Sequence, residues 1–151
     1  MPNWCKGDLK VRGTKENLTK FILEGLHPVN ALGERKRKLE LDEFGDVHTN
    51  ETCWIENTHR GFAIGVDVYI SEFEDNEMPI AVFASKFAWG IDAEQLLQIC
   101  KKYNVDMKIY AFERGMEFNQ EIEIVNGEIV KDEEIHFEDY GWDCICPELG
   151  G

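Results

Sequence analysis

Large apolar residues occupy every second position from Phe62 to Ile70, and no other feature of the sequence constrains the fold as strongly. A period of two is typical of a strand with one buried face. A polar connection over residues 72–77 leads to a second strand pattern, from Pro79 to about Phe87. Two neighbouring strands with a short polar connection predict an antiparallel hairpin.

A strand and then a helix are predicted before this hairpin. Residues 3–12 alternate between apolar and polar side chains, as a strand with one buried face does. Thr14 can then cap a segment whose apolar residues are spaced three and four apart. This spacing predicts a helix that ends near Gly25.

A second helix and further strands are predicted after the hairpin. Asp92 and Gln95 have capping-box spacing, so they predict a helix that ends near Asn104. Alternation over residues 105–111 and 118–124 predicts two more strands. The tight turn Asn126-Gly127 then leads into a short strand over residues 128–131.

This order predicts an α+β protein with the ferredoxin-like split βαβ plan. Two helices would pack on one face of an antiparallel sheet, with a C-terminal hairpin as an extension. At 151 residues the chain is expected to form a single domain over residues 1–151. Residues 26–61 are interpreted as an insertion with one short strand, and residues 132–151 as an acidic tail.

The formal net charge of −14 is large for a chain of this size. Residues 1–40 carry nine basic and five acidic residues, whereas residues 113–151 carry two basic and twelve acidic ones. The overall field repels phosphate, which argues against direct binding to nucleic acid or to an anionic membrane. One end of the chain is nevertheless mildly basic.

The sequence also indicates where the protein works. No apolar run approaches the roughly 18 residues that span a bilayer, and the polar N-terminus lacks a signal core. Five scattered cysteines form an odd set that suits reduced thiols better than a disulfide framework. We therefore expect a cytoplasmic protein without a membrane anchor.

Three short stretches carry a resemblance to a known family. The first is Met1-Pro2-Asn3-Trp4-Cys5 with Leu9, Val11 and Gly13, and the second is Phe87-Ala88-Trp89-Gly90. The third is Tyr110, Glu113, Gly115 and Phe118, followed by Asn126-Gly127. With these residues the chain resembles the YubB-type ferredoxin-like proteins of phages and plasmids. The resemblance implies a ferredoxin-like fold and a mobile-element origin, and it brings no catalytic residues with it.

Cysteines near the C-terminus are the candidates for a metal site. Cys144 and Cys146, with Cys5 or His136, offer enough ligands for zinc. A single residue separates the pair, whereas zinc motifs use two to four, and there is no second pair. Cysteines in apolar surroundings are more often core residues. We therefore expect neither a metal nor another cofactor.

Cys53 with His48 or His59 is the candidate for nucleophilic catalysis, within residues 44–61. The acidic neighbours of Cys53 raise the pKa of its thiol, which disfavours the reactive thiolate. The sequence contains no phosphate-binding glycine loop, serine elbow or paired-histidine zinc helix. An enzyme is therefore the least favoured hypothesis, and no catalytic residue is assigned.

The sheet face away from the helices is a candidate surface for single-stranded nucleic acid. It combines aromatic and basic side chains: Trp4, Lys6, Lys10, Arg12, Tyr110 and Phe112. RNA-recognition domains stack bases on a similar open face. The net charge and the missing recognition-motif aromatics argue against this function. We favour the alternative that the insertion or the acidic tail folds over the face.

Carboxylates near the C-terminus form a candidate partner-binding surface. Its residues are Asp132, Glu133, Glu134, Glu138, Asp139 and Asp143. A charge run is usually only a solvated face. Spread over a compact phage protein, however, carboxylates could imitate the phosphates of nucleic acid and occupy the basic channel of another protein.

The preferred prediction is a non-enzymatic accessory protein of a mobile element that binds a host or phage protein through this acidic surface. Its main rival is a module that binds single-stranded nucleic acid on the open sheet face. The sequence leaves open who the partner is and whether the chain forms oligomers.

Overall fold

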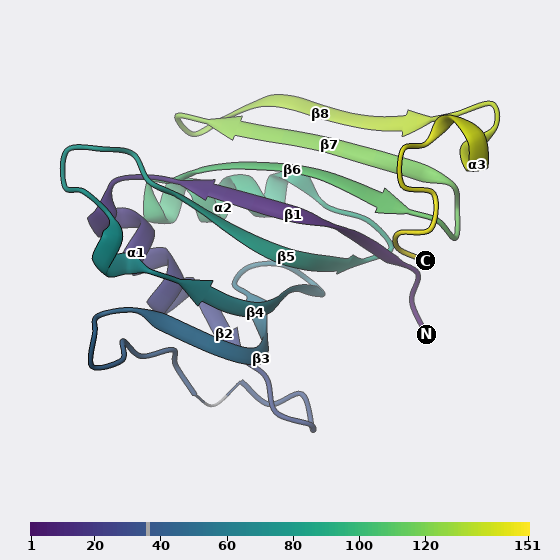
Figure 1. Cartoon of the computed structure of the whole chain (residues 1–151). Helices are drawn as coiled ribbons and strands as arrows, with labels where there is room; N and C mark the ends of the chain where they lie inside the picture. Colours follow the sequence, from purple (N-terminus) through teal and green to yellow (C-terminus); the bar gives the residue numbers. More distant parts are fainter. Residues whose placement is uncertain (36) are drawn as a thin grey trace.

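The computed structural model describes residues 1–35 and 37–151. Within them, eight strands form one antiparallel sheet, accompanied by three α-helices and a 3-10 turn (Figure 1). The strands are β1 (Trp4–Arg12), β2 (Leu26–Pro28), β3 (Val47–Ile55), β4 (Gly61–Val68), β5 (Ile80–Ala88), β6 (Asp106–Glu113), β7 (Phe118–Val125) and β8 (Glu128–His136). The helices are α1 (Lys15–Gly25), α2 (Ala93–Tyr103) and α3 (Tyr140–Asp143), and the 3-10 turn is η1 (Ile70–Glu72). The prediction of an α+β fold built on an antiparallel sheet is confirmed.

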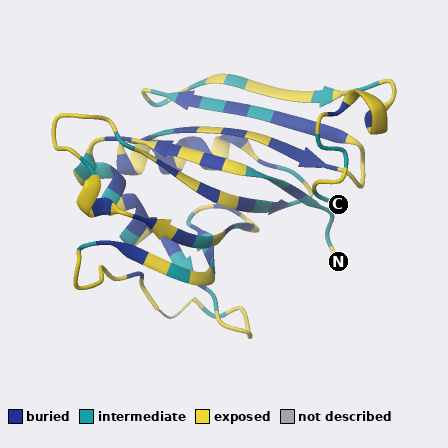
Figure 2. Cartoon of the chain, in the orientation of Figure 1, coloured by how far each residue is buried: buried dark blue, intermediate teal, exposed yellow. Residues whose placement is uncertain are grey.

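β1 lies inside the sheet, whose strand order is β2-β3-β4-β5-β1-β6-β7-β8. It pairs antiparallel with β5 on one side and β6 on the other. Leu9 and Val11 are buried, whereas Asp8 and Lys10 are exposed, so the alternation of this strand is as predicted. Figure 2 shows buried and exposed segments alternating along β1 and β5. The sheet therefore has a covered face and an open face.

α1 and α2 pack against each other and against the sheet. Thr14 caps α1, because its hydroxyl accepts a hydrogen bond from the Asn17 backbone N–H at 3.1 Å. The ring of Phe21 in α1 lies edge-on to Tyr103 of α2, with 5.7 Å between the ring centroids. It lies in the same way against Phe83 of β5, at 6.3 Å. None of the helices in the described part of the chain combines the length and the apolarity needed to cross a bilayer.

The capping-box spacing correctly predicts that Asp92 begins α2. The Asp92 carboxylate accepts a hydrogen bond from the Glu94 backbone N–H at 3.0 Å. The side-chain oxygen of Gln95 accepts instead from the His59 backbone N–H, at 3.2 Å. Gln95 therefore connects the turn between β3 and β4 to the start of the helix.

Residues 26–61 contain more of the sheet than the single short strand predicted. β2 and β3 both pair within this segment, and β3 pairs in turn with β4. The middle of β3, residues 48–52, is polar, so hydrophobic alternation does not reveal it. The alternating residues Leu39, Leu41 and Phe44 are not part of a strand and lie in turns and irregular structure.

The alternation over residues 62–70 predicts one apolar face, and this is correct only in part. Val66 is buried, whereas Ile64, which is in phase with it, is exposed. A β-bulge over residues 49–52 shifts the register of β3 opposite this point. Gly65 has a φ of 82°, which glycine adopts easily. The first half of β4 is thereby turned over, and Ile64 faces the open side of the sheet.

β8 continues to His136, well beyond the short strand predicted for residues 128–131. Asp132, Glu133 and Glu134 are therefore part of the sheet and not of a tail. β8 is the last strand on this side of the described sheet, and Figure 2 shows that it is mainly exposed. A strand with one free edge and few buried positions needs few apolar residues, which is why its length was underestimated.

Candidate functional site on the open sheet face

Basic and aromatic side chains of two strands meet on the open face. Lys6, Asp8 and Lys10 alternate with the buried residues of β1. β6 lies alongside in antiparallel register, so Asp8 is opposite Tyr110 and Lys10 is opposite Lys108. Lysines from both strands and an aromatic ring therefore share one surface.

A hollow of about 480 Å³ lies on this surface. Its lining combines charged, aromatic and aliphatic side chains from β1, β4, β5, β6 and the segment after α3. They include Lys6, Lys10, Ile64, Lys108, Tyr110 and Leu149. Asp8 also lines the hollow. An apolar hollow with a few convergent charged groups is a typical binding site, and here most of those charges are positive.

The two aromatic residues of β6 differ in their exposure to solvent. Tyr110 is 37% exposed, and its hydroxyl accepts a hydrogen bond from Asn119 Nδ2 at 3.1 Å. Phe112 is only 9% exposed, because Tyr140 and Cys144 pack against it. Tyr110 therefore offers a ring for stacking, whereas Phe112 forms part of the wall of the hollow.

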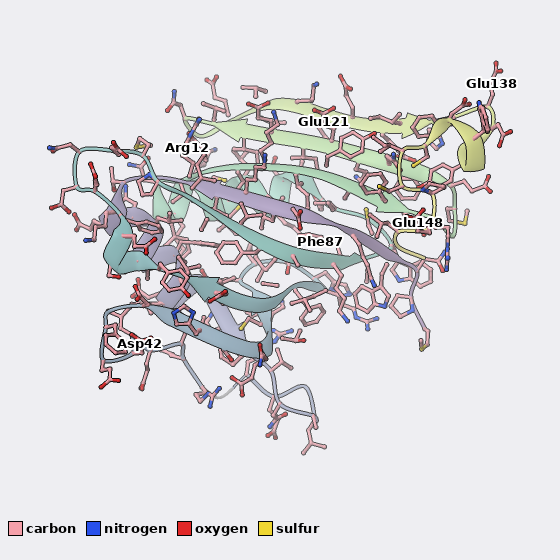
Figure 3. All side chains as sticks on the ribbon, in the orientation of Figure 1. Arg12, Asp42, Phe87, Glu121, Glu138 and Glu148 are labelled. Carbon is pink, nitrogen blue, oxygen red and sulfur yellow. The ribbon has the colours of Figure 1, made fainter. Side chains whose placement is uncertain are left out.

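Arg12 lies away from the hollow, at the end of β1 far from the C-terminus (Figure 3). Its Nη2 and Nε lie 2.8 and 3.2 Å from Asp106 Oδ2. This ion pair offsets the charge of the guanidinium. Arg12 was expected on the nucleic-acid face, and it lies on that side of β1, but it does not line the hollow.

Trp4 lies at the other end of β1, among cations. Its ring is edge-on to Phe62 of β4, with 6.1 Å between the centroids. Lys86 Nζ lies 4.4 Å from the centroid of the Trp4 ring, and the guanidinium carbon of Arg60 lies 5.6 Å from it. These cation–π contacts extend the positive charge of the open face beyond the hollow.

Sequence reasoning did not single out Lys86, Lys108 and Arg60. Lys108 could have been found, because it is two residues from Tyr110 and so falls on the same side of its strand. Lys86 follows in the same way from the alternation of β5. Arg60 precedes β4 in a turn, and its position depends on the packing of that turn.

The segment after α3 covers one end of the open face, which is one of the two coverings expected from the sequence. The Gly151 backbone N–H donates to the Trp4 carbonyl at 2.8 Å, and Leu149 lines the hollow. The carboxylates expected to cover the basic strand are elsewhere, because residues 132–134 lie in β8. Since β6 and β7 separate β8 from β1, the lysines of the hollow keep their access.

The acidic surface is exposed throughout but does not form one flat array. All six of its residues are exposed: Asp132, Glu133, Glu134, Glu138, Asp139 and Asp143. Within β8, Asp132 and Glu134 face the helix side, and Glu133 faces the open side, because successive side chains alternate. Glu138 lies next to α3, at the opposite end of the molecule from Arg12 (Figure 3).

In the described part of the chain all five cysteines are free. Cys144 Sγ lies 3.4 Å from Asn119 Nδ2, and the Cys5 thiol contacts Gln120 Oε1 at 3.6 Å. His136 contacts Glu134, and Cys146 packs against the small cluster of Phe112, Tyr140 and Cys144. Cys5, Cys144 and His136 therefore each have a partner outside the set of ligands considered for zinc.

Burial raises the pKa of Cys53 to about 11, so this thiol stays protonated near neutral pH. The cause is burial and not the acidic neighbours that the sequence suggested. The Cys53 thiol donates to the Glu51 carbonyl at 3.7 Å, whereas His48 Nδ1 contacts Asp67. His59 is exposed. These contacts give Cys53 a structural environment and not that of an activated nucleophile.

The described residues contain one group of three possible metal ligands, which sequence reasoning missed: Asp42, Asp46 and His48, with ligand atoms within 4.8 Å of one another. Asp42 Oδ1 accepts from the backbone N–H groups of Phe44 and Asp46, at 2.8 and 3.0 Å. Asp46 Oδ1 accepts from the Ser71 N–H at 2.8 Å. Asp42 therefore closes the loop before β3, and Asp46 connects this loop to η1.

Comparison of the chain with protein-family models, with curated proteins and with solved structures finds no match.

Proposed function

We propose that the open sheet face binds single-stranded nucleic acid, in a protein that is not an enzyme. One observation carries the proposal: the hollow between β1 and β6 brings Lys6, Lys10 and Lys108 around the exposed ring of Tyr110. An aromatic ring stacks bases of any sequence, and lysines beside it contact the phosphates. The sequence, with its net charge, favoured a protein partner over nucleic acid. The order is reversed here because the charge around the hollow is mostly positive, whereas that of the whole chain is negative.

The charge close to the hollow, and not the net charge of the chain, determines whether a phosphate can bind there. At ordinary ionic strength, charges on a surface act over about 10 Å. Lys86 and Arg60 around Trp4 add to the lysines of the hollow, while the carboxylates of the acidic surface lie on β8 and beyond it. Glu123 of β7 contacts Lys108 at 3.6 Å, so a phosphate must compete with this carboxylate. We therefore expect moderate affinity that depends strongly on salt.

We further propose that the centre of the chain follows the ferredoxin-like split βαβ plan. Its support is the succession β1, α1, β4, β5, α2, β6 together with the strand order β4-β5-β1-β6. β2 and β3 would then be an insertion, and β7 and β8 an extension. The plan places both helices on one face and leaves the other free, and RNA-recognition domains bind through such a face. This likeness concerns architecture alone.

The proposal is tested by equilibrium binding of a fluorescent oligonucleotide of about twelve residues, as RNA and as DNA. One variant removes the charge of the three hollow lysines, and a matched control removes three lysine charges from α1 and α2. Loss of three phosphate contacts weakens binding about 100-fold at 0.1 M salt. Equal affinity of the two variants, or no binding by the wild type, contradicts the proposal. The variants are Lys6→Gln/Lys10→Gln/Lys108→Gln and Lys15→Gln/Lys20→Gln/Lys101→Gln.

A second candidate function is favoured by the exposure of all six residues of the acidic surface. In this alternative the chain is a cytoplasmic accessory protein of a phage or plasmid, the origin implied by the family resemblance. It binds a basic host or phage protein by presenting carboxylates in place of phosphates. The five free cysteines suit a reducing compartment.

The second candidate is tested by affinity capture from a host lysate. Wild type is compared with a variant in which Asp132, Glu133, Glu134, Glu138 and Asp139 are changed to Asn or Gln. Capture of a basic nucleic-acid-handling protein by the wild type alone supports this function. Equal capture by both forms makes the acidic surface a solvated face.

A further inference from the structure

The turn between β5 and α2 holds an exposed tryptophan on left-handed backbone. Trp89 is 61% exposed and has a φ of 67°, a conformation that bulky residues rarely adopt. Its backbone N–H donates to the Asn3 carbonyl at 2.8 Å. Gln120 of β7 binds the backbone of Ile91 twice, at 2.8 and 3.1 Å. The turn is therefore fixed on both sides, with the ring left in solvent.

A shallow, widely open hollow of about 480 Å³ lies beside this ring. Trp89 and Phe118 line it, together with two carboxylates of β8, Asp132 and Glu134. Glu134 is opposite Gln120 in the register of β7 and β8, so these side chains share the helix side of the sheet. An aromatic ring and two carboxylates therefore border the same space, on the opposite side of the sheet from the lysines of the open face.

The groups that surround the hollow keep it acidic. Asp92 also lines it and caps α2, and Glu94 lies in the first turn, so both offset the positive end of the helix dipole. His136 Nε2 contacts Glu134 Oε1 at 2.9 Å. Hydrogen bonding to His136 uses a single oxygen of that carboxylate.

Two of the other three tryptophans already have a cation. Arg35 lies 3.7 Å from the centroid of the Trp54 ring, and Lys86 lies over Trp4. Within residues 1–35 and 37–151, the cation–π contacts of the structure include neither Trp89 nor Trp142, and of these two rings only Trp89 lines the hollow. The Trp89 ring, with carboxylates beside it, is therefore complementary to a cation from another molecule.

We propose that this hollow binds the cationic side chain, arginine or lysine, of a basic extended segment in a protein partner. A guanidinium stacks on an indole ring and donates hydrogen bonds to carboxylates, so Trp89, Asp132 and Glu134 supply both kinds of contact. The segment is extended because β8 is the last strand of the described sheet and can pair with a further strand. The inference rests on the second candidate function, and it identifies which part of the acidic surface makes specific contacts.

In the test, a hexa-arginine peptide is titrated into the whole chain. NMR of the tryptophan indole N–H groups monitors its binding. Titration is expected to shift the Trp89 indole resonance more than the other three. This resonance is assigned as the one that is missing from the spectrum of Trp89→Gly. The variant Asp132→Asn/Glu134→Gln is expected to bind about tenfold more weakly than wild type, since hydrogen bonds to charged groups are lost. The control Glu133→Gln/Glu138→Gln removes the same charge outside the hollow and is expected to bind nearly as wild type does.

Trp89→Gly separates loss of the ring from loss of the fold. Glycine suits the left-handed backbone, so we expect an unchanged or higher midpoint in urea denaturation together with about fivefold weaker peptide binding. If both charge variants bind equally and Trp89→Gly binds as wild type does, the hollow is not the site and only general charge attraction remains. Absence of peptide binding by the wild type overturns the inference and the second candidate function together.

Discussion

Replacing Lys10 by glutamine is expected to change how strongly salt weakens single-strand binding. Lys6, Lys10 and Lys108 line the hollow on the open face, which allows three phosphate contacts. Each contact with a single strand contributes about 0.7 to the slope of log affinity against log salt, so the wild-type slope is about −2.1. Between about 50 and 200 mM salt the affinity then falls about 18-fold for wild type and about sevenfold for Lys10→Gln, whose slope is about −1.4.

A change of opposite sign in the same hollow strengthens this test. Asp8 lines the hollow, and its carboxylate repels a phosphate there. Asp8→Asn is therefore expected to raise the affinity about two- to fivefold at low salt, as for an exposed charge contact. Damage to the fold would lower the affinity, so a gain is specific to the removed charge.

Fluorescence anisotropy at several salt concentrations measures these slopes directly. Lys20→Gln serves as the control, because Lys20 lies exposed on α1. Lys10 does not contact a phosphate if Lys10→Gln keeps the wild-type slope, or if Lys20→Gln lowers the slope equally. A fall in affinity for Asp8→Asn would also contradict the binding of a phosphate in the hollow.

Three further predictions concern the scaffold. Gly7→Ala is expected to lower the free energy of unfolding by about 1–3 kcal/mol in urea denaturation, because the added methyl group would clash with the Tyr110 carbonyl oxygen; an unchanged midpoint contradicts this. The Ser71 backbone N–H holds the pKa of Asp46 below its usual range, so the ionised Asp46 carboxylate stabilises the folded state. This contribution to the free energy of unfolding is present above pH about 4 and is lost as the pH falls through the lowered pKa. The melting temperature of Asp46→Asn should therefore depend less on pH than that of wild type on the acid side. Parallel curves of melting temperature against pH for the two proteins would refute the stabilising role of the Asp46 carboxylate. With a thiol reagent at neutral pH, Cys146 should react first, because it is the one cysteine of the described chain that is not buried; rapid reaction of a second thiol would show that another site opens.

Local patterns predicted the elements that depend on nearby residues. The alternation of residues 3–12 and the caps at Thr14 and Asp92 correctly predicted β1, α1 and α2, since each signal is complete within a few positions. β3 and the second half of β8 escaped prediction because their polar residues leave no alternation to follow. The bulge opposite Gly65 reversed part of β4, and a bulge depends on the partner strand as well as on its own sequence.

For the candidate sites too, some features could be predicted from the sequence and others depend on the fold. Alternation of side chains along a strand is enough to predict from the sequence that Lys6, Lys10 and Tyr110 lie on one side of their strands. The folded structure was needed to show that these residues meet Lys108 in one hollow and that Trp89 lines another hollow with the carboxylates of β8. Those contacts join positions far apart in the chain, and they exist only once strand order and register are set by the packing of the whole sheet.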